Sequence, residues 1–380
     1  MNLIQCVCRS AAFAINSCAR HTILCLLLAL TITGQVLANR SHLHYPVVLV
    51  PGIIGSRAYV KPRGELDAPF RQIWLNISSL LHPRNLTREF GLTYLNTTNR
   101  SYDNEEFEVT FPGWGDTTNL EFLDESQKLI GQYFNRLVER LLKTQFYHRN
   151  ISIRGAPYDF RRAPHENINF LSEFKNLIEE TYVQNKKKKI VILAHSLGTL
   201  YSLYFLHSQS NEWKRTYLEA FVSVSGPYGG SARVMAAFAS GYNLGVPFYP
   251  SLSLRHLLRS FTSMALLLPD ERLWSPAEPL LITPNYNYSV HDMKRLFEDI
   301  DYAIGYNMFQ TAKHAMDYLN RPAGVHNVYC IHGTGVATVE KAMYKPATSS
   351  RKPFPDQLPQ FVHGDGDGTV NLRSLTVLST

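Results

Sequence analysis

Short runs of apolar residues alternate with amphipathic segments along most of this chain. The apolar runs predict buried strands, and the segments with apolar residues at helical spacing predict helices. The predicted strands lie at 45–52, 151–161, 190–193, 220–224 and 325–333. The predicted helices lie at 129–142, 170–183 and 199–206. This alternation predicts an α/β protein with a mainly parallel sheet that has helices on both faces.

Two stretches interrupt this alternation. Residues 57–104 are polar and poorly periodic, and we expect them to form an insertion rather than part of the core. Residues 232–320 are rich in Leu, Phe, Tyr and Pro but hold few strand signals, which favours a cap or lid. Both stretches are therefore predicted to be insertions in one α/β domain that spans 39–380.

The first insertion contains an aromatic and apolar patch among basic residues. Phe70, Ile73 and Trp74 lie beside Arg71. Exposed aromatic residues next to arginine suit contact with a membrane interface. The alternative is a small satellite core that buries Trp74, and the sequence leaves both interpretations open.

The N-terminus predicts a secretory signal peptide at 1–38. Arg9 and Arg20 precede the apolar run 23–32, and residues 36–38 resemble a small-residue cleavage site. The alternative is an uncleaved anchor, although the run is short for a membrane span of about 20 residues. We therefore expect a protein of the secretory pathway, either secreted or in the lysosomal lumen.

The cysteines and the glycosylation sequons are also relevant to the predicted secretory pathway. Cys330 is the one cysteine after residue 38, so the mature chain is expected to have no internal disulfide. Sequons cluster in the first insertion, which favours a glycosylated surface there. The sequon asparagines are Asn39, Asn76, Asn85, Asn96, Asn99, Asn150 and Asn287.

Composition and charge limit the class of partner. The 380 residues are 45% apolar, which allows a sizeable core, and carry a formal charge of +7. This basicity suits an anionic membrane better than a nucleic acid, because no nucleic-acid-binding motif accompanies it. The basic run 186–189 is expected to be a solvated loop. We expect a phospholipid membrane or a lipoprotein surface as partner, and no nucleic acid.

The pentapeptide Ala194-His195-Ser196-Leu197-Gly198 has the pattern of a nucleophile elbow between a strand and a helix. Small residues flank the serine because its backbone is strained and the helix packs close to the strand. Ser196 is therefore the predicted nucleophile. The N–H of Leu197 is predicted to face the oxyanion that develops on an ester under attack.

The second oxyanion donor is expected in the turn after the first strand. Pro51-Gly52 ends that strand, and the N–H of Ile53 is the candidate. The alternative is an ordinary strand-ending turn, for which Pro-Gly is equally typical.

A serine nucleophile needs a histidine base and a carboxylate that fixes the histidine tautomer. In this architecture the carboxylate follows the serine in the chain. Asp367, in the glycine-rich turn 363–370, is the predicted carboxylate, with Asp365 in reserve. A calcium loop is the alternative for this turn, but it lacks the distal Glu of such loops. No metal or cofactor is expected.

The base is expected after Asp367, but no histidine follows it in this sequence. His195, His332 and His363 are poorly placed by chain order or by their expected direction. We therefore expect either a C-terminus that continues beyond residue 380 or a catalytically weak chain.

Seven motifs lie between residues 43 and 378. They are Val48-Leu49-Val50-Pro51-Gly52, Phe111-Pro112-Gly113-Trp114-Gly115, Gly155-Ala156-Pro157-Tyr158-Asp159-Phe160-Arg161, Ala194-His195-Ser196-Leu197-Gly198, Gly226-Pro227-Tyr228-Gly229-Gly230, Asn285-Tyr286-Asn287-Tyr288 and Gly366-Asp367-Gly368-Thr369-Val370. Together they resemble the lecithin:cholesterol acyltransferase family, most closely its lysosomal phospholipase A (group XV) branch.

The resemblance implies an α/β-hydrolase fold with a membrane-binding insertion and a cap that carries a mobile lid. It implies that Ser196 and Asp367 are the family nucleophile and aspartate. It also implies that the N–H groups of Ile53 and Leu197 form the oxyanion hole.

The chain departs from the family pattern in several places. Relatives usually close the insertion with a disulfide, but 57–98 contains no cysteine. Cys330 matches a family cysteine whose partner would fall near Leu378, and the pattern is lost around Thr376. Ile53 stands where the lysosomal branch has an acidic residue, so an acidic pH optimum is not implied.

The expected function is that of a serine-dependent O-acyltransferase and phospholipase. It would remove an acyl chain from a glycerophospholipid and pass it to a lipid alcohol or to water. One alternative is a weak or inactive lipid-binding protein with the same fold, and another is a hydrolase of small esters or triglycerides. The sequence leaves open the acyl acceptor, the preferred phospholipid, the position cleaved and any need for an activator protein.

Overall fold

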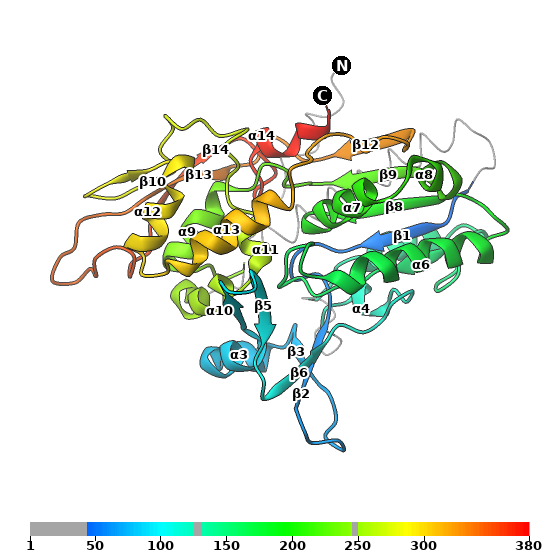
Figure 1. The fold of residues 1–380 in the computed structure, drawn as a ribbon, viewed down its shortest axis with the longest axis horizontal. Helices are drawn as coiled ribbons and strands as arrows, with labels where there is room; N and C mark the ends of the chain where they lie inside the picture. Colours follow the sequence, from blue (N-terminus) through cyan, green and yellow to red (C-terminus); the bar gives the residue numbers. More distant parts are fainter. Residues whose placement is uncertain (1–43, 125–130, 245–249, 380) are drawn as a thin grey trace.

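A five-stranded parallel sheet forms the centre of the structure (Figure 1). The computed structural model describes residues 44–124, 131–244 and 250–379, so the predicted signal peptide and Asn39 lie outside the described residues. The sheet order is β12-β9-β8-β1-β7, and each neighbouring pair is parallel. Its strands are β1 (Val47–Val50), β7 (Ile153–Gly155), β8 (Ile190–His195), β9 (Leu218–Val224) and β12 (Asn327–Ile331). The predicted α/β class with a parallel sheet is confirmed.

Helices cover both faces of this sheet, because successive residues of β1 are buried in two different cores. Val48 and Val50 belong to one core, and Val47 and Leu49 belong to a second. Residues of α6 and α7 build the first core, and residues of α5 build the second. These helices are α5 (Asn135–Leu142), α6 (Ile168–Gln184) and α7 (Leu197–Ser208). A strand buried on both faces reads as a continuous apolar run, which explains why β1 was predictable.

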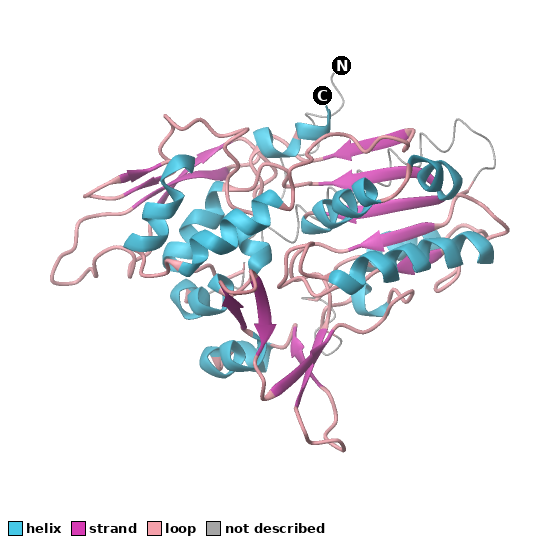
Figure 2. Ribbon diagram, viewed as in Figure 1, coloured by secondary structure: helices cyan, strands magenta, loops and turns pink. Residues whose placement is uncertain are grey.

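A second layer faces the carboxyl ends of the parallel strands, whose arrowheads point toward it in Figure 1. Its helices are α9 (Ala232–Ser240), α10 (Arg255–Arg259), α11 (Thr262–Leu266), α12 (Met293–Asp299) and α13 (Ile304–His314). Figure 2 shows this layer as mainly helical, with a small sheet at its outer edge. That sheet has the order β11-β10-β13-β14 and consists of β10 (Leu281–Ile282), β11 (Asn287–Tyr288), β13 (Thr338–Met343) and β14 (Gln360–Gly364).

The segment after β1 forms a separate lobe at the lower end of the molecule in Figure 1. It contains a three-stranded antiparallel sheet of order β3-β2-β6 and a hairpin, β4–β5. Its strands are β2 (Ala58–Pro62), β3 (Arg71–Trp74), β4 (Leu92–Leu95), β5 (Arg100–Asp103) and β6 (Phe107–Thr110). Its helices are α2 (Ile77–Leu80) and α3 (Pro83–Phe90).

The predicted membrane patch of this lobe is largely buried, which corrects part of the sequence analysis. Ile73 is fully buried and Trp74 is 3% exposed, so the membrane contact predicted for these two residues is wrong. The Trp74 Nε1–H donates to the Ile54 carbonyl at 2.9 Å, and the indole packs edge-on against Phe160. Both residues belong to the core that β1, α6 and α7 share, so Trp74 is buried in the main core rather than in a small satellite core. Phe70, by contrast, is 39% exposed.

The remaining helices are short. They are α4 (Thr118–Glu121), α8 (Asn211–Tyr217), α14 (Leu372–Leu375) and the 3-10 turns η1 (Ser251–Leu254), η2 (Val290–Asp292) and η3 (Val377–Ser379). Among the residues that the structure describes, no helix combines the length and apolar character that crossing a bilayer requires.

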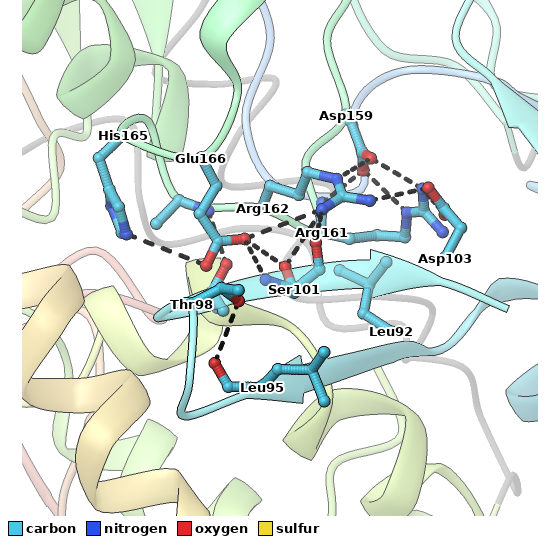
Figure 3. A network of polar contacts seen from close by, with 12 residues as sticks. Leu92, Leu95, Thr98, Ser101, Asp103, Asp159, Arg161, Arg162, His165 and Glu166 are labelled. Carbon is cyan, nitrogen blue, oxygen red and sulfur yellow. Dashed lines mark hydrogen bonds and ion pairs between the residues drawn. The ribbon is translucent and has the colours of Figure 1, made fainter.

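Buried charges join the β4–β5 hairpin to the segment that follows β7 (Figure 3). Asp103 on β5 lies 2.7 Å from both the Arg161 and the Arg162 guanidinium. Asp159 also pairs with both arginines, at 2.7 and 3.0 Å. The Arg161 side chain is only 1% exposed, so its charge is satisfied by these two carboxylates rather than by water.

Candidate active site

Ser196 lies between the last residue of β8 and the first residue of α7, at the carboxyl edge of the central sheet. Its backbone has φ 50° and ψ −125°, a conformation that L residues rarely adopt. The Ser196 N–H donates to the Val224 carbonyl of β9 at 2.9 Å, which holds the sharp turn in place. Such strain at a strand-to-helix turn is typical of a nucleophile elbow.

The turn after β1 lies directly against this elbow. A β-carbon on Gly198 would stand 2.2 Å from the Pro51 carbonyl oxygen, and one on Gly52 would stand 2.9 Å from the Ser196 Cβ. Neither contact is sterically possible. Glycine at both positions therefore lets the Pro51-Gly52 turn approach the serine closely.

The two predicted oxyanion donors come from the residue after the serine and from the turn that packs against it. Leu197 begins α7, so its N–H has no acceptor within the helix and lies at the positive end of the helix dipole. Ile53 follows Gly52, whose carbonyl accepts from the Gly55 N–H at 3.1 Å in a tight turn. Across the described part of the chain, neither N–H donates to another backbone carbonyl.

Asp367 and Asp365 occupy different environments in the turn after β14. Asp367 is 7% exposed and accepts from the N–H groups of Thr369 (2.9 Å) and Val370 (2.8 Å). Asp365 is exposed and accepts from the Gly335 N–H at 2.5 Å. Burial therefore favours Asp367 as the carboxylate that acts on another side chain.

The turn that holds Asp367 is attached to the loop after β9, the strand next to β8. The Ser231 hydroxyl donates to the Thr369 carbonyl at 3.0 Å, and the Gly229 N–H donates to the Ser374 hydroxyl at 2.8 Å. These bonds hold the turn at the carboxyl edge where Ser196 lies.

His332 is closer to this edge than the sequence suggested. It follows β12, and the preceding carbonyl, that of Ile331, accepts from the Ser225 N–H at 2.8 Å. Burial lowers the pKa of His332, and the charge of Asp367 partly opposes that shift. Its Nδ1 is buried and has no hydrogen-bond partner within the described residues. The sequence placed His332 inside the predicted strand 325–333, and only the observed end of β12 at Ile331 puts it at the carboxyl edge.

The other two discounted histidines differ from His332. His195 is half-buried, its Nδ1 lies 2.6 Å from the Tyr133 hydroxyl, and burial lowers its pKa to about 4. His363 lies on β14 and is exposed. Tyr133 itself was not singled out by the sequence, because nothing in its local pattern marks its contact with the elbow.

The predicted glycosylation sites within the described residues are accessible. Asn76 is half-buried, and the others are exposed. The exposed sequon asparagines are Asn85, Asn96, Asn99, Asn150 and Asn287. Their modification stays a prediction. In the ranges 44–124, 131–244 and 250–379, no group of His, Cys, Asp and Glu side chains is arranged to hold a metal ion.

Comparisons with known proteins identify the family of this chain. The family model "Lecithin:cholesterol acyltransferase" matches residues 70–323 and 312–379. The chain is 38% identical to "Lysosomal phospholipase A and acyltransferase" of Homo sapiens, over 87% of this chain and 80% of that protein. It is 33% identical to "Phosphatidylcholine-sterol acyltransferase" of Gallus gallus, again over 87% and 80%.

A solved structure supports the fold alone. A chain in "The crystal structure of Tle4-Tli4 complex" has a TM-score of 0.50 and 13% identity, with 88% of this chain and 89% of that chain covered. The family model and the relatives, which cover most of the chain, establish the family. This chain belongs to the lecithin:cholesterol acyltransferase family.

Proposed function

We propose that this chain is a serine-dependent phospholipase and O-acyltransferase. It removes an acyl chain from a glycerophospholipid and passes that chain to a lipid alcohol or to water. The observation that carries the proposal is the strained backbone of Ser196 between β8 and α7, against which the Pro51-Gly52 turn packs closely. The printed names of the relatives, which are phospholipase and acyltransferase names, support the same chemistry.

In the first half of the reaction, the Ser196 Oγ forms a bond to the carbonyl carbon of the ester. Negative charge then develops on the carbonyl oxygen, where the N–H groups of Ile53 and Leu197 stabilise it. The loss of one such donor costs about 10²–10³-fold in kcat in serine hydrolases. The ester C–O bond then breaks, and the lysolipid leaves as an alcohol after it takes up a proton.

In the second half, the hydroxyl of a lipid alcohol or of water attacks the acyl-serine and restores Ser196. The scheme requires an imidazole to carry the proton in both halves, and Asp367 is the carboxylate proposed to orient it. The burial of Asp367 suits this role, because water competes little for a hydrogen bond between a buried carboxylate and an imidazole. No metal or cofactor takes part in this scheme.

The lobe formed by 57–104 is proposed to contact a phospholipid membrane or a lipoprotein surface. Its exposed apolar side chains include Leu66 (90% exposed), Phe70 (39%) and Leu81 (68%). The layer formed by 232–320 is proposed to be a cap with a lid over the carboxyl edge of the sheet. The lysosomal relatives support a luminal site of action in the secretory pathway.

The test is fatty-acid release from phospholipid liposomes, with the Ser196→Ala variant as control and a lipid alcohol as optional acceptor. Release that depends on Ser196 supports the proposal, and the yield of alcohol ester separates transfer from hydrolysis. Equal liposome binding by both proteins without turnover would indicate a non-catalytic lipid-binding protein. Activity that persists in Ser196→Ala would refute the mechanism.

A further inference from the structure

Tyr133 connects the two halves of the proposed oxyanion hole. Its hydroxyl oxygen lies 2.8 Å from the Gly52 nitrogen and 2.6 Å from the His195 Nδ1. Gly52 directly precedes Ile53, the donor on the loop after β1. His195 directly precedes Ser196, and Leu197, the donor on α7, follows that serine. One phenol therefore bonds to both segments that carry an oxyanion N–H.

Hydrogen-bonding capacity favours one arrangement of the hydrogens. The Gly52 N–H can only donate, so the Tyr133 oxygen accepts from it. The phenol has one hydrogen, and the His195 Nδ1 can accept it when the neutral imidazole carries its proton on Nε2. We assign this tautomer because it pairs the phenol hydrogen as well as the phenol oxygen.

The protonation states that this assignment needs are stable. Burial raises the pKa of the Tyr133 phenol, so the phenol keeps its hydrogen at neutral pH. Burial lowers the pKa of His195 to about 4, so the imidazole stays neutral. Both hydrogen bonds are therefore present across the ordinary pH range.

Tyr133 is itself held firmly. Its N–H donates to the Glu121 carbonyl at 2.9 Å, and its ring packs against the ring of Phe134 with the ring centres 4.3 Å apart. A β-carbon on Gly55 would stand 2.9 Å from the Tyr133 ring, so the turn after β1 packs against the ring as well. The phenol is thus a fixed point to which both segments are attached.

We propose that Tyr133 is a positioning residue for the acyl-transfer reaction, because its hydroxyl sets the spacing between the Ile53 and Leu197 N–H groups through Gly52 and His195. This inference rests on the proposed function of Ser196. Tyr133 touches neither the serine hydroxyl nor the ester. It acts only through the placement of two donors that must meet one oxygen atom, and errors of about 1 Å in such placement cost about 10²-fold in rate.

The first measurement is steady-state hydrolysis of p-nitrophenyl butyrate, a soluble ester that separates the chemistry from membrane binding. Tyr133→Phe removes the hydroxyl and keeps the ring. We expect its kcat to fall by about 10- to 100-fold, with KM changed by less than about twofold. Tyr147→Phe is the matched control, because Tyr147 is a buried phenol that donates to the Tyr45 carbonyl at 3.1 Å, away from the elbow.

The second measurement changes His195, the acceptor of the hydrogen bond from the Tyr133 hydroxyl. In His195→Asn, the amide Oδ1 takes the place of Nδ1 and can still accept from the Tyr133 hydroxyl. In His195→Leu, a methyl group of similar shape cannot accept. We expect His195→Asn to recover most of the kcat lost in His195→Leu. The double variant of Tyr133→Phe with His195→Leu should be no slower than the slower single variant.

The outcomes separate the inference from the proposed function. A wild-type chain that neither hydrolyses the ester nor reacts at Ser196 with a fluorophosphonate, which would form an Oγ–P bond and release fluoride, overturns both. An active wild type with an equally active Tyr133→Phe overturns the inference alone. So does an equal loss of kcat in Tyr147→Phe, or equal kcat values in His195→Asn and His195→Leu.

Discussion

Gly52 and Ser196 are in contact across the elbow, with room for a hydrogen atom on Gly52 and nothing larger. A methyl group there would stand 2.9 Å from the Ser196 Cβ and 3.0 Å from the His195 Nδ1. The turn after β1 and the elbow therefore have one mutual arrangement, and it is the arrangement that brings Ile53 beside the serine.

Gly52→Ala should therefore reduce activity strongly, because the turn must move away from Ser196 to admit the methyl group. We expect kcat for a soluble ester to fall by about 10²-fold, since the displaced N–H no longer meets the oxyanion. Gly64→Ala is the control, because open space surrounds Gly64, whose φ is +88°. Equal kcat values for the two variants would contradict the close contact.

Asp367→Asn should abolish most of the activity, and Asp365→Asn should not. An amide in place of the buried carboxylate no longer fixes the tautomer of the imidazole, a change that costs about 10⁴-fold in kcat in a serine protease triad. Asp365 is exposed and binds the Gly335 N–H, so its loss affects a surface turn. The measurement is fatty-acid release from liposomes by each variant, and a reversed order of effects would reassign the carboxylate.

Arg161→Met should destabilise the protein strongly. The variant removes the more buried of the two arginines that pair with Asp159 and Asp103 and leaves Arg162 as their remaining partner. The loss of one member of a buried pair costs about 3–5 kcal/mol in the free energy of unfolding, which is the upper end of the expected loss. Arg88→Met is the control, since Arg88 and Glu106 form a pair whose side chains are 61% and 58% exposed. Removal of that pair should cost less than about 1 kcal/mol. Urea unfolding of both variants tests the difference. Comparable losses in the free energy of unfolding would show that the Arg161 cluster contributes no more to stability than an exposed ion pair.

His165 should make the folded state less stable in acid. Burial, together with the charge of Arg100, lowers the pKa of His165 from 6.5 to about 4, whereas the unfolded chain binds its proton near pH 6.5. Between these values the unfolded state holds more protons, so stability falls as the pH falls. The slope contributed by this residue approaches about 1.4 kcal/mol per pH unit.

The check is the free energy of unfolding of wild type and His165→Leu from pH 7 to pH 4. The variant should show the weaker loss of stability toward acid. His314→Leu is the control, because the His314 side chain is 87% exposed. Burial raises the pKa of the neighbouring Glu166, which acts in the opposite direction, so the informative quantity is the difference between wild type and variant. Parallel pH profiles would contradict the prediction.

Leu66→Ser and Phe70→Ser should weaken binding to phospholipid vesicles, while hydrolysis of a soluble ester stays unchanged. Each substitution removes an exposed apolar side chain, and transfer of such a side chain from water is worth about 1.5–3 kcal/mol. About tenfold weaker binding is expected for Leu66→Ser, measured by vesicle sedimentation. Trp74→Ser should instead lower the unfolding temperature, because that side chain is buried. A loss of vesicle binding in a folded Trp74→Ser, with Leu66→Ser unaffected, would place the lipid contact elsewhere.

The parts of the fold that the sequence predicted are those whose pattern is local. β8, the elbow and α7 follow one another within 190–208, and their signals are an apolar run, small residues and a second apolar segment of helical length. α7 is buried on nearly all sides, so the amphipathic character is absent from this helix. The burial of Trp74 was undecidable because it depends on Ile54 and Phe160, which are distant in the chain. β13 and β14 carry no strong alternation, and they form a sheet only by pairing with each other and with β10.

The same distinction applies to the site. Ser196, Ile53 and Leu197 were predicted from neighbouring residues, whereas the effect of the Asp367 charge on His332 and the contact of Tyr133 with His195 join segments far apart in the chain. The preference for Asp367 over Asp365 rests on burial, which only the folded turn defines.

The pairing of Asp103 with Arg161 and Arg162 has a mechanical consequence. The hairpin belongs to the lobe proposed to touch lipid, and the arginines belong to the segment that leaves the central sheet. These ion pairs therefore resist rotation of the lobe relative to the central sheet. A protein built in this way would have one fixed orientation on a flat lipid surface. That orientation, set by three side chains remote from the chemistry, would determine the direction from which an ester approaches the serine.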